Sequence, residues 1–481
     1  MSKPFLQMTL AGYPYFKAAA MFALLAILHA GMQTGHTSGS ASAANPASTA
    51  SPAATASPPH GQARHQTTPS ILLDDQFILD ASKAIDLLYN RNYNSSLNAL
   101  ESWKEAMPEH PLWPLLEAIE SWWPVLIDLE NTSYDDVFLQ KAQVVADLCN
   151  QILKEHPDHL DALIIRSIIN GQIARYHSNR YRWLQSFRHA RRALRDFFLV
   201  ESSYPELPDI QFGIGMYRYF AAFLVEEYTL ARPLKWMLPA GDRQEGLARL
   251  KAAADSSIFM EPEATYFLGH IYLHYEREPD LALEYLERLY HRYPDNSYYQ
   301  RLYIRSLFQL RHFDDALVAI EENLNRPSVL PPHQSPPELS LLDTSGRERL
   351  YPTLRDESGT ASQAGRKTTS PEEHNPPVIT RHEVLALRED LLTLRGQIHY
   401  HRLEYDLAES DFLKAVAEAE KLAPFAQRSN LITSLFFLGE LSIRNNERIN
   451  ARYYFSRAAT PDIDHHYVKR AREALRKHRL R

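Results

Sequence analysis

The chain has 481 residues, of which 44% are hydrophobic and 23% are charged, and its formal net charge is −7. This composition is typical of a globular protein, and 16 glycines are too few for a fold rich in tight strand turns, so we expect a helical protein. An acidic chain makes a poor general nucleic-acid binder, because neutralising phosphates requires clustered Lys and Arg in excess. We therefore expect no nucleic-acid partner.

The first 43 residues have the features of a targeting segment. Lys3 and Lys17 precede an apolar run over residues 18–30, and Ala41-Ser42-Ala43 offers a small-residue cleavage site. The run is shorter than the roughly 20 residues that a membrane-spanning helix needs. We predict a signal peptide over 1–43 and export to the periplasm or cell envelope. The alternative is a retained N-terminal anchor, which would then be the contact with the membrane.

A linker and a helical array follow. Residues 44–70 consist mostly of Ser, Ala, Thr, Pro and Gly and cannot bury enough apolar surface to fold, so we predict a disordered linker. Apolar residues recur with helical period over 71–325, which predicts a degenerate array of helical repeats. Its first unit is indicated by an apolar stripe that includes Ala84 and Leu88 and by the helix-ending Pro108.

Residues 112–129 are rich in tryptophan. Trp122 and Trp123 could form a flat platform for a carbohydrate or another ring-shaped ligand. Large aromatic rings on a repeat helix more often fill the gap between neighbouring helices. We favour packing and keep both tryptophans as candidate binding residues.

The helix expected from Asn179 onward carries two different faces. One face is an apolar stripe that begins at Trp183 and ends at Phe197. The other face consists of four arginines, at Arg188, Arg191, Arg192 and Arg195. Four guanidinium groups within two turns repel one another, so they require a carboxylate or phosphate nearby. We favour ion pairs with neighbouring repeats, and the alternative is a binding site for a partner's anion.

Other residue types that often carry chemistry give no site. His270 and His274 are four residues apart, a spacing that could hold a metal, but no Glu lies between them and no third ligand suggests itself. The only cysteine, Cys149, excludes an intramolecular disulfide and a cysteine-based metal site. The glycines at 241 and 246 do not start a phosphate-binding loop, because Leu247 stands where Lys is required. We expect no metal and no cofactor.

One spacing recurs in the C-terminal half: a glycine, then two alanines seven residues apart with an aromatic or leucine between them. It occurs strictly in two units. A third unit has one extra residue between the glycine and the first alanine, with Leu286 in place of the aromatic and no second alanine. Small residues at these positions let two antiparallel helices approach closely, while the larger side chain fills the gap. The residues of the pattern are Gly269, Tyr272, Ala282, Gly396, Ala408, Phe412, Ala415, Gly439, Ala451, Phe455 and Ala458.

The C-terminal part divides into an insertion and the two regular units. Residues 326–380 lose the helical period and gain many prolines, which predicts a disordered insertion. Residues 381–481 should contain the two regular helix pairs and a basic capping helix.

The recurring pattern resembles the tetratricopeptide repeat (TPR) superfamily. Phe212-Gly213-Ile214-Gly215, followed by Gly241-Asp242-Arg243 and Gly246-Leu247, is similar to the tetratricopeptide repeat protein 39 family and its bacterial relatives. The superfamily resemblance implies an all-α fold in which helical hairpins stack into a right-handed superhelix whose concave groove holds peptides or partner proteins. Asp242 should cap a helix, with Glu245 completing a capping box.

These features favour a non-catalytic scaffold or adaptor. We expect protein–protein interaction in the cell envelope, with a peptide or helix of the partner in the concave groove. The alternative is an envelope enzyme that acts on glycans, with its site among the Trp-rich helices. That alternative requires a closed pocket with a buried acid of raised pKa.

Overall fold

The computed structural model describes residues 70–227, 241–326, 379–422, 428–461 and 463–480. Their regular secondary structure is entirely helical, so the prediction of an all-α chain is confirmed. The predicted segment 1–43, nearly all of the linker 44–70 and nearly all of the insertion 326–380 lie outside the described residues.

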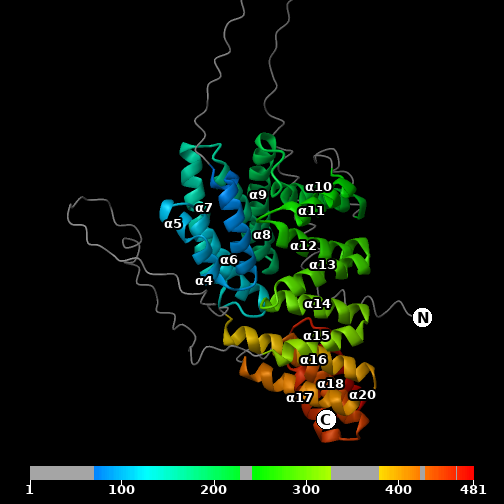
Figure 1. Ribbon diagram of the computed structural model, residues 1–481. Helices are drawn as coiled ribbons and strands as arrows, with labels where there is room; N and C mark the ends of the chain where they lie inside the picture. Colours follow the sequence, from blue (N-terminus) through cyan, green and yellow to red (C-terminus); the bar gives the residue numbers. More distant parts are fainter. Residues whose placement is uncertain (1–69, 228–240, 327–378, 423–427, 462, 481) are drawn as a thin grey trace, which may run out of the picture.

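After a short 3-10 turn at Ile71–Leu73, antiparallel hairpins follow one another along the chain (Figure 1). Their helices are α3 (Asp75–Tyr89), α4 (Tyr93–Ala99), α5 (Glu101–Ala106), α6 (Leu112–Ile127), α7 (Asp135–Glu155), α8 (Leu160–Asn179), α9 (Trp183–Ser203), α10 (Ile210–Glu227), α11 (Arg243–Ser256), α12 (Glu261–Ile271), α13 (Pro279–Arg292), α14 (Ser297–Leu310), α15 (Phe313–Asn325), α16 (Arg381–His401), α17 (Tyr405–Lys421), α18 (Ser429–Arg444), α19 (Arg448–Ala459) and α20 (His466–Lys477). From α6 to α19 each even-numbered helix pairs with the next, and α20 packs on α18 and α19.

The glycines of the recurring pattern lie where the two helices of a hairpin touch. A Cβ atom added to Gly396 would lie 2.8 Å from the Phe412 ring, and one added to Gly439 would lie 2.7 Å from the Phe455 ring. Both rings are fully buried. The hairpins α16–α17 and α18–α19 are therefore held at a separation that a larger residue in the first helix would not permit.

The extra residue in the unit of Gly269 forms a π-helical turn. Helix α12 continues into this turn at Tyr272–Glu276, which ends at Arg277 in the left-handed conformation, with φ of 59°. A π turn adds one residue to a helix without changing the direction of the chain. Glu278 directly precedes α13, and its N–H donates to the Tyr272 carbonyl.

Helix caps agree with the sequence only in part. The Asp242 carboxylate accepts from the N–H groups of Gln244 and Glu245, as expected. The Glu245 carboxylate instead accepts from Arg249 at 2.8 Å, so the expected capping box is only half formed. A complete capping box occurs at Thr380 and Glu383, where α16 begins.

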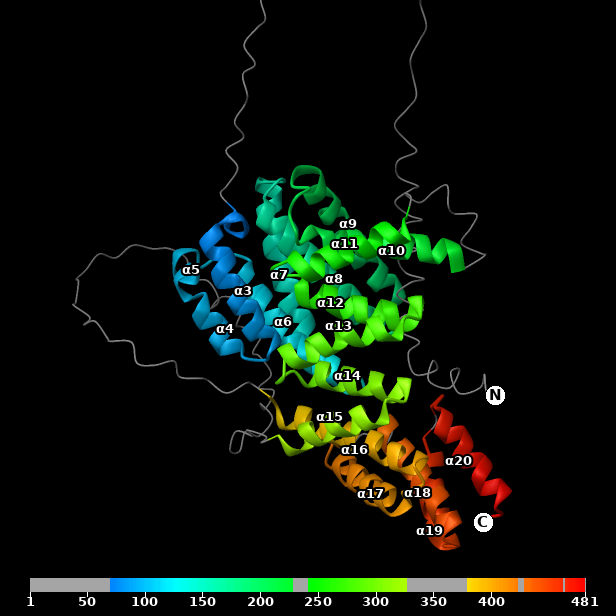
Figure 2. The same ribbon diagram turned by 45° about the vertical axis from the view of Figure 1, so that its right-hand side comes forward.

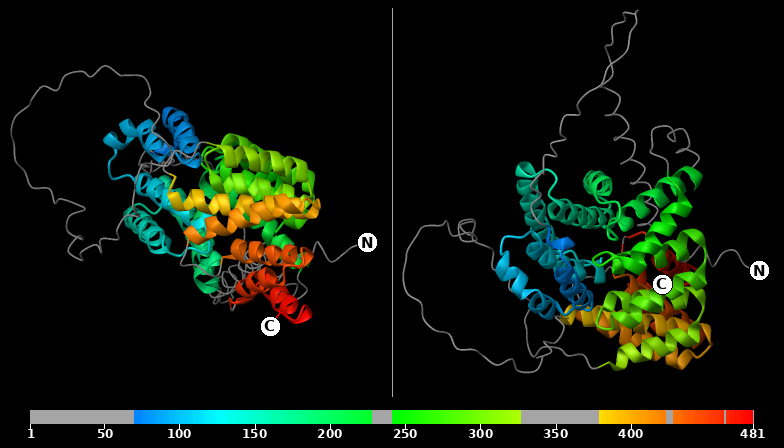
Figure 3. Two further views of the ribbon diagram at one scale, coloured as in Figure 1. Left: turned by 90° about the horizontal axis from the view of Figure 1, so that it is seen from below. Right: turned by 45° about the horizontal axis from the view of Figure 1, so that its top comes forward.

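The array curves until its N-terminal helices reach helices about 200 to 300 residues later in the chain. Asn90 donates to Asp295 at 3.0 Å, and the Asn296 amide donates to the Tyr89 carbonyl at 2.7 Å. Arg91 pairs with Glu383 at 2.9 Å. Figures 2 and 3 show the N-terminal helices lying beside α14 and α16, and not at the far end of an open rod. The solenoid is therefore closed on one side by contacts between distant repeats.

No helix in the described ranges is both long and apolar enough to cross a bilayer.

Candidate functional site

The curved array encloses a central cavity of about 510 Å³, lined mainly by the even-numbered helices. Its apolar wall includes Leu115 and Ile119 of α6, Leu194 of α9 and Phe220 of α10. Cavities of this size with apolar walls and few polar groups are typical ligand sites.

A polar cluster of residues from α8, α12 and α14 also lies in the cavity wall. The Arg175 guanidinium lies 3.3 Å from the Glu263 carboxylate and 4.6 Å from the centre of the Tyr266 ring. The hydroxyls of Tyr266 and Tyr298 are 2.8 Å apart. Burial raises the pKa of Tyr266 well above its ordinary value, so this hydroxyl stays protonated and can donate.

Helix α8 also presents two residues to the cavity that the sequence analysis did not single out, Gly171 and Gln172. In the described part of the chain, no atom of another element lies within 4 Å of the position that a Cβ on Gly171 would take. The Oε1 atom of Gln172 is buried and has no hydrogen-bond partner among the described residues. An isolated glycine inside a helical pattern was the one signal in the sequence that could have drawn attention here.

A group of ion pairs joins the loop after α6 to α16 and α18 and contributes to the cavity wall; we call it the seam. Arg428 lies 2.8 Å from Asp128 and 2.6 Å from Glu389, and His382 lies 2.8 Å from Asp128. Burial alone would raise the pKa of Asp128, but hydrogen bonds from His382 and Arg428 hold it well below its usual range. Burial raises the pKa of Glu389 to about 7, against the opposing effect of Arg428.

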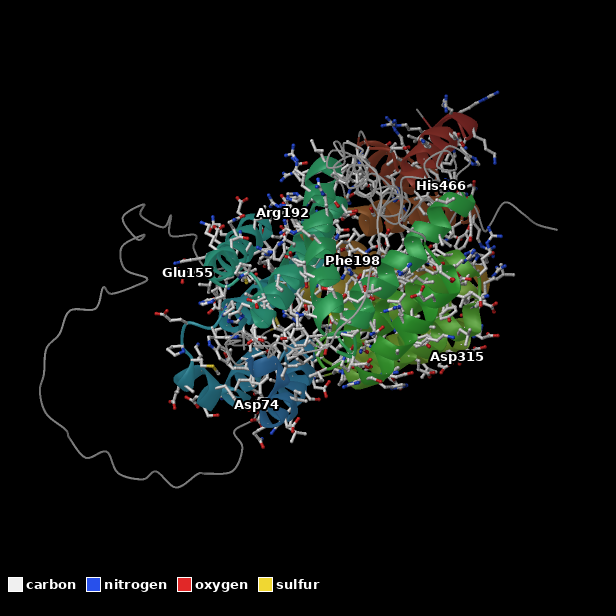
Figure 4. The ribbon with its side chains drawn as sticks, turned by 90° about the horizontal axis from the view of Figure 1, so that it is seen from above. Asp74, Glu155, Arg192, Phe198, Asp315 and His466 are labelled. Atoms are coloured by element: carbon white, nitrogen blue, oxygen red, sulfur yellow. The ribbon has the colours of Figure 1, made fainter. Side chains whose placement is uncertain are left out.

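The arginine face of α9 points away from the cavity. Arg188, Arg192 and Arg195 are exposed, and Arg191 is half-buried. Arg195 lies 3.3 Å from Asp196, whose carboxylate already binds Arg166 at 2.7 Å. Figure 4 shows Arg192 on the outer side of α9 and Phe198 on the side toward α10.

We favoured ion pairs between that face and neighbouring repeats, but among the described residues the structure shows none at Arg188 or Arg192, two of its four positions. No carboxylate lies within ion-pair distance of Arg188 or Arg192 in the ranges that the structure covers. A binding role for these arginines stays a prediction.

The two candidate tryptophans are inside the protein. Trp122 is 1% exposed and Trp123 is 2% exposed. The Trp122 ring packs 4.9 Å from Phe138, and the Trp123 ring packs 5.5 Å from Tyr89, measured between ring centres. Neither indole contributes to the cavity wall, so neither is open to a ligand in this structure.

Two glycines of the second motif, Gly213 and Gly246, lie where neighbouring helices touch. A Cβ on Gly213 would lie 2.6 Å from the Phe197 ring, and one on Gly246 would lie 2.4 Å from the Tyr219 backbone N. These glycines allow α10 to approach α9 and α11.

The histidine pair and the cysteine have no catalytic surroundings. His270 and His274 stack with ring centres 5.4 Å apart, and burial lowers the pKa of His274 to about 4. No group of three His, Cys, Asp or Glu residues suited to a metal occurs in the part of the chain described. Burial raises the pKa of Cys149 to about 12, which keeps it a thiol.

Burial raises the pKa of three carboxyl groups in the described residues, as a glycan-acting enzyme would need. One of them, Asp209, accepts hydrogen bonds from the backbone N–H groups of residues 258–260 and does not line the cavity. Burial raises the pKa of both Glu120 and Glu389 to about 7. Glu120 pairs with Arg91 at 2.6 Å and Glu389 with Arg428, and neither carboxyl lines the cavity. Both acids thus belong to ion pairs that join distant helices.

Comparisons with known proteins add little to this geometry. No protein-family model matches the chain, and no curated protein matches it. The resemblance to the tetratricopeptide repeat protein 39 family is therefore not confirmed.

Solved structures that match over most of the chain include three of IFIT1. A monomeric mutant with Gppp-AAAA has a TM-score of 0.32 and 13% identity, over 85% of this chain and 87% of that chain. Another monomeric mutant, with m7Gppp-AAAA, has a TM-score of 0.31 and 13% identity, over 84% and 86%. The human IFIT1 dimer with m7Gppp-AAAA has a TM-score of 0.19 and 14% identity, over 80% and 94%. Similarity this low carries no argument about what the present chain binds.

Proposed function

We propose that this chain is a non-catalytic scaffold of the TPR type, which holds a segment of a partner protein in its central cavity and acts in the cell envelope. The observation that carries the proposal is the cavity itself. It lies on the inner side of the curved array, and its wall is formed by side chains from most of the even-numbered helices. A segment bound there would contact many repeats at once.

The distribution of polar groups favours a segment with two chemically different sides. Leu115, Ile119 and Phe220 supply apolar surface. Burying apolar side chains of the partner against this surface stabilises the complex by about 25 cal/mol per Å². Arg175, Glu263 and Tyr298 add a polar group to the same cavity wall. An amphipathic helix or an extended peptide with alternating side chains has this combination.

Placement in the envelope is supported by sequence features alone. Lys3, Lys17, the apolar run 18–30 and the small residues at 41–43 favour export followed by cleavage. N-terminal sequencing of the chain from fractionated cells tests this. A mature chain that begins near residue 44 in the envelope fraction supports the proposal. An intact chain in the membrane supports the anchored alternative, and an intact chain in the cytosol contradicts both.

The glycine contacts of α10 and α11 support keeping the tetratricopeptide repeat protein 39 family as the proposed relatives. At Gly213 and Gly246 a ring or the backbone comes within 2.6 Å and 2.4 Å of the position that a Cβ would take. The alternative of a glycan-acting enzyme has less support, because both candidate tryptophans are buried and none of the three described acids with a raised pKa, Glu120, Asp209 and Glu389, lines the cavity.

Site-specific photocrosslinking in the producing cells tests the binding role. Leu194 of α9 lines the cavity, whereas Leu199 of the same helix is 47% exposed outside it. Each is replaced by p-benzoylphenylalanine, the cells are irradiated, and the adducts are identified by mass spectrometry. We expect a discrete protein adduct at Leu194, mapped to one segment of the partner, and none of that species at Leu199.

Two outcomes would contradict the proposal. A lipid, glycan or nucleotide adduct at Leu194 would show that the cavity serves another ligand class. Equal adducts at both positions would show that the partner does not enter the cavity.

A further inference from the structure

Gly171 differs from the other glycines of the described helices. A Cβ on Gly213, Gly246, Gly269 or Gly396 would meet another atom at 2.8 Å or less, and these glycines are needed for packing. A Cβ on Gly171 would meet no atom of the other described elements within 4 Å. Glycine inside a helix is less favourable than alanine, and no contact within the described residues offsets that disadvantage at Gly171.

The neighbouring residue, Gln172, has unused hydrogen-bonding capacity. Its Oε1 atom is buried and unpartnered within the described ranges. A buried acceptor left unpaired is unfavourable. The side-chain amide of glutamine offers one acceptor and two donors, the complement of a peptide group.

Arg175, one turn further along α8, does not compete for the same role. Its guanidinium is engaged by the Glu263 carboxylate and lies over the Tyr266 ring. These contacts hold the Arg175 side chain in place. The open position at Gly171 and the unpaired amide at Gln172 stand beside each other on the inner face of α8, both in the cavity wall.

We propose that Gly171 and Gln172 are the positions at which the main chain of the bound segment crosses α8. Gly171 leaves room for the segment to approach the helix, and the Gln172 amide pairs with one of its peptide groups. This inference rests on the proposed function. It names the part of the partner that is recognised at this place, a main-chain amide, which a hydrocarbon chain does not supply.

The test is the yield of the Leu194 photocrosslink in four backgrounds, Gly171→Ala, Gly171→Phe, Gln172→Leu and Gln151→Leu. Gln151 is exposed on α7 and serves as the control for the loss of an amide. We expect Gly171→Ala and Gln151→Leu to keep the yield within about twofold. Gly171→Phe should lower the crosslink yield at least tenfold, because the ring would occupy the space through which the segment approaches α8. Gln172→Leu should lower the yield about tenfold, because one hydrogen bond is lost in a site that excludes water.

Melting curves of the same variants separate blocked binding from unfolding. Gly171→Phe should melt no lower than the parent, because glycine is the poorer helix former and the position is open. If Gly171→Phe does not fold, Gln172→Leu alone decides the matter. A parental yield in folded Gly171→Phe or in Gln172→Leu would overturn the inference. Failure of the parent to crosslink at Leu194 would instead contradict the proposed function.

Discussion

The exposed arginines of α9 are the residues with the least explanation inside the protein. Arg188 and Arg192 lie on successive turns, and Asp196, the carboxylate beside Arg195, also binds Arg166. Unpaired surface charges contribute little to stability. They can contribute much to binding when a partner supplies the anion.

Charge reversal separates these roles. In Arg188→Glu/Arg192→Glu, we expect the melting temperature to change by less than about 2 °C, because exposed substitutions seldom shift stability by more than about 0.5 kcal/mol each. Recovery of a partner from the cell envelope should fall at least tenfold if the face binds an anion. The control Lys104→Glu/Lys154→Glu makes the same charge change at exposed positions of α5 and α7. A large loss of melting temperature in the arginine variant alone would assign the face a structural role.

At the scale of the helical hairpin, two glycines in similar positions should respond oppositely to alanine. Gly171→Ala should raise the free energy of unfolding by about 1 kcal/mol, because the helix gains propensity and nothing is displaced. Gly396→Ala should lower it by about 1–3 kcal/mol, because the added Cβ would lie 2.8 Å from the buried Phe412 ring.

Urea unfolding of the two variants measures this difference. Equal and positive effects would mean that the α16–α17 hairpin can relax around an extra methyl group. Equal and negative effects would mean that Gly171 is also held by packing.

The hairpins are the part of the molecule that the sequence predicts best. The spacing from Gly396 to Phe412 reports a contact between helices adjacent in the chain, so it is readable from a short window. The extra residue near Tyr272 was visible as a spacing, but its π-helical form was not. The hairpin turns also hold Arg91, Arg277 and Leu403 at positive φ, where glycine would be the expected signal.

Closure of the array could not be predicted in the same way. Asp128 and Arg428 are 300 residues apart, and neither carries a periodic or motif signal. The cavity residues Gly171 and Gln172 were missed for the same reason, since the surface that they face exists only once the array has curved. The cavity and the seam both form only when helices far apart in the sequence come together.

The seam should make a large contribution to the stability of the whole molecule. Asp128→Ala removes one of the two carboxylates bound by the buried Arg428 and the partner of His382. Breaking a buried ion pair from one side typically costs about 3–5 kcal/mol. We expect a loss of about 3 kcal/mol in urea unfolding, against less than about 0.5 kcal/mol for Asp158→Ala on the exposed α7–α8 turn. Equal midpoints for the two variants would show that the array does not depend on closure.

The shifted pKa values of Glu389 and Asp128 determine how these two groups make stability depend on pH. The pKa of Glu389 is raised to about 7 from 4.5, so its contribution is complete below pH 4.5 and is lost as the pH rises through 7. The lowered pKa of Asp128 has the opposite sign, so its contribution is present above about pH 4 and is lost on further acidification. The free energy of unfolding should therefore peak between about pH 4 and 6 as far as these two groups are concerned.

Glu389→Gln isolates the first effect. Gln cannot ionise, so the fall in stability between about pH 5 and 8, of the order of 1–3 kcal/mol for Glu389, should be reduced in this variant. Urea unfolding at about pH 5, 6.5 and 8 measures the slope. A parental slope in Glu389→Gln would show that Glu389 does not titrate in this range.

The central claim is that a partner's chain runs through the cavity of a closed solenoid. A structure of the complex isolated through the Leu194 photocrosslink tests it most directly. We expect the partner's main chain to lie along the inner face of α8, within hydrogen-bond distance of Gln172 and beside Gly171. A partner seated on the arginine face of α9 or on the outer helices, with the cavity empty, would contradict it.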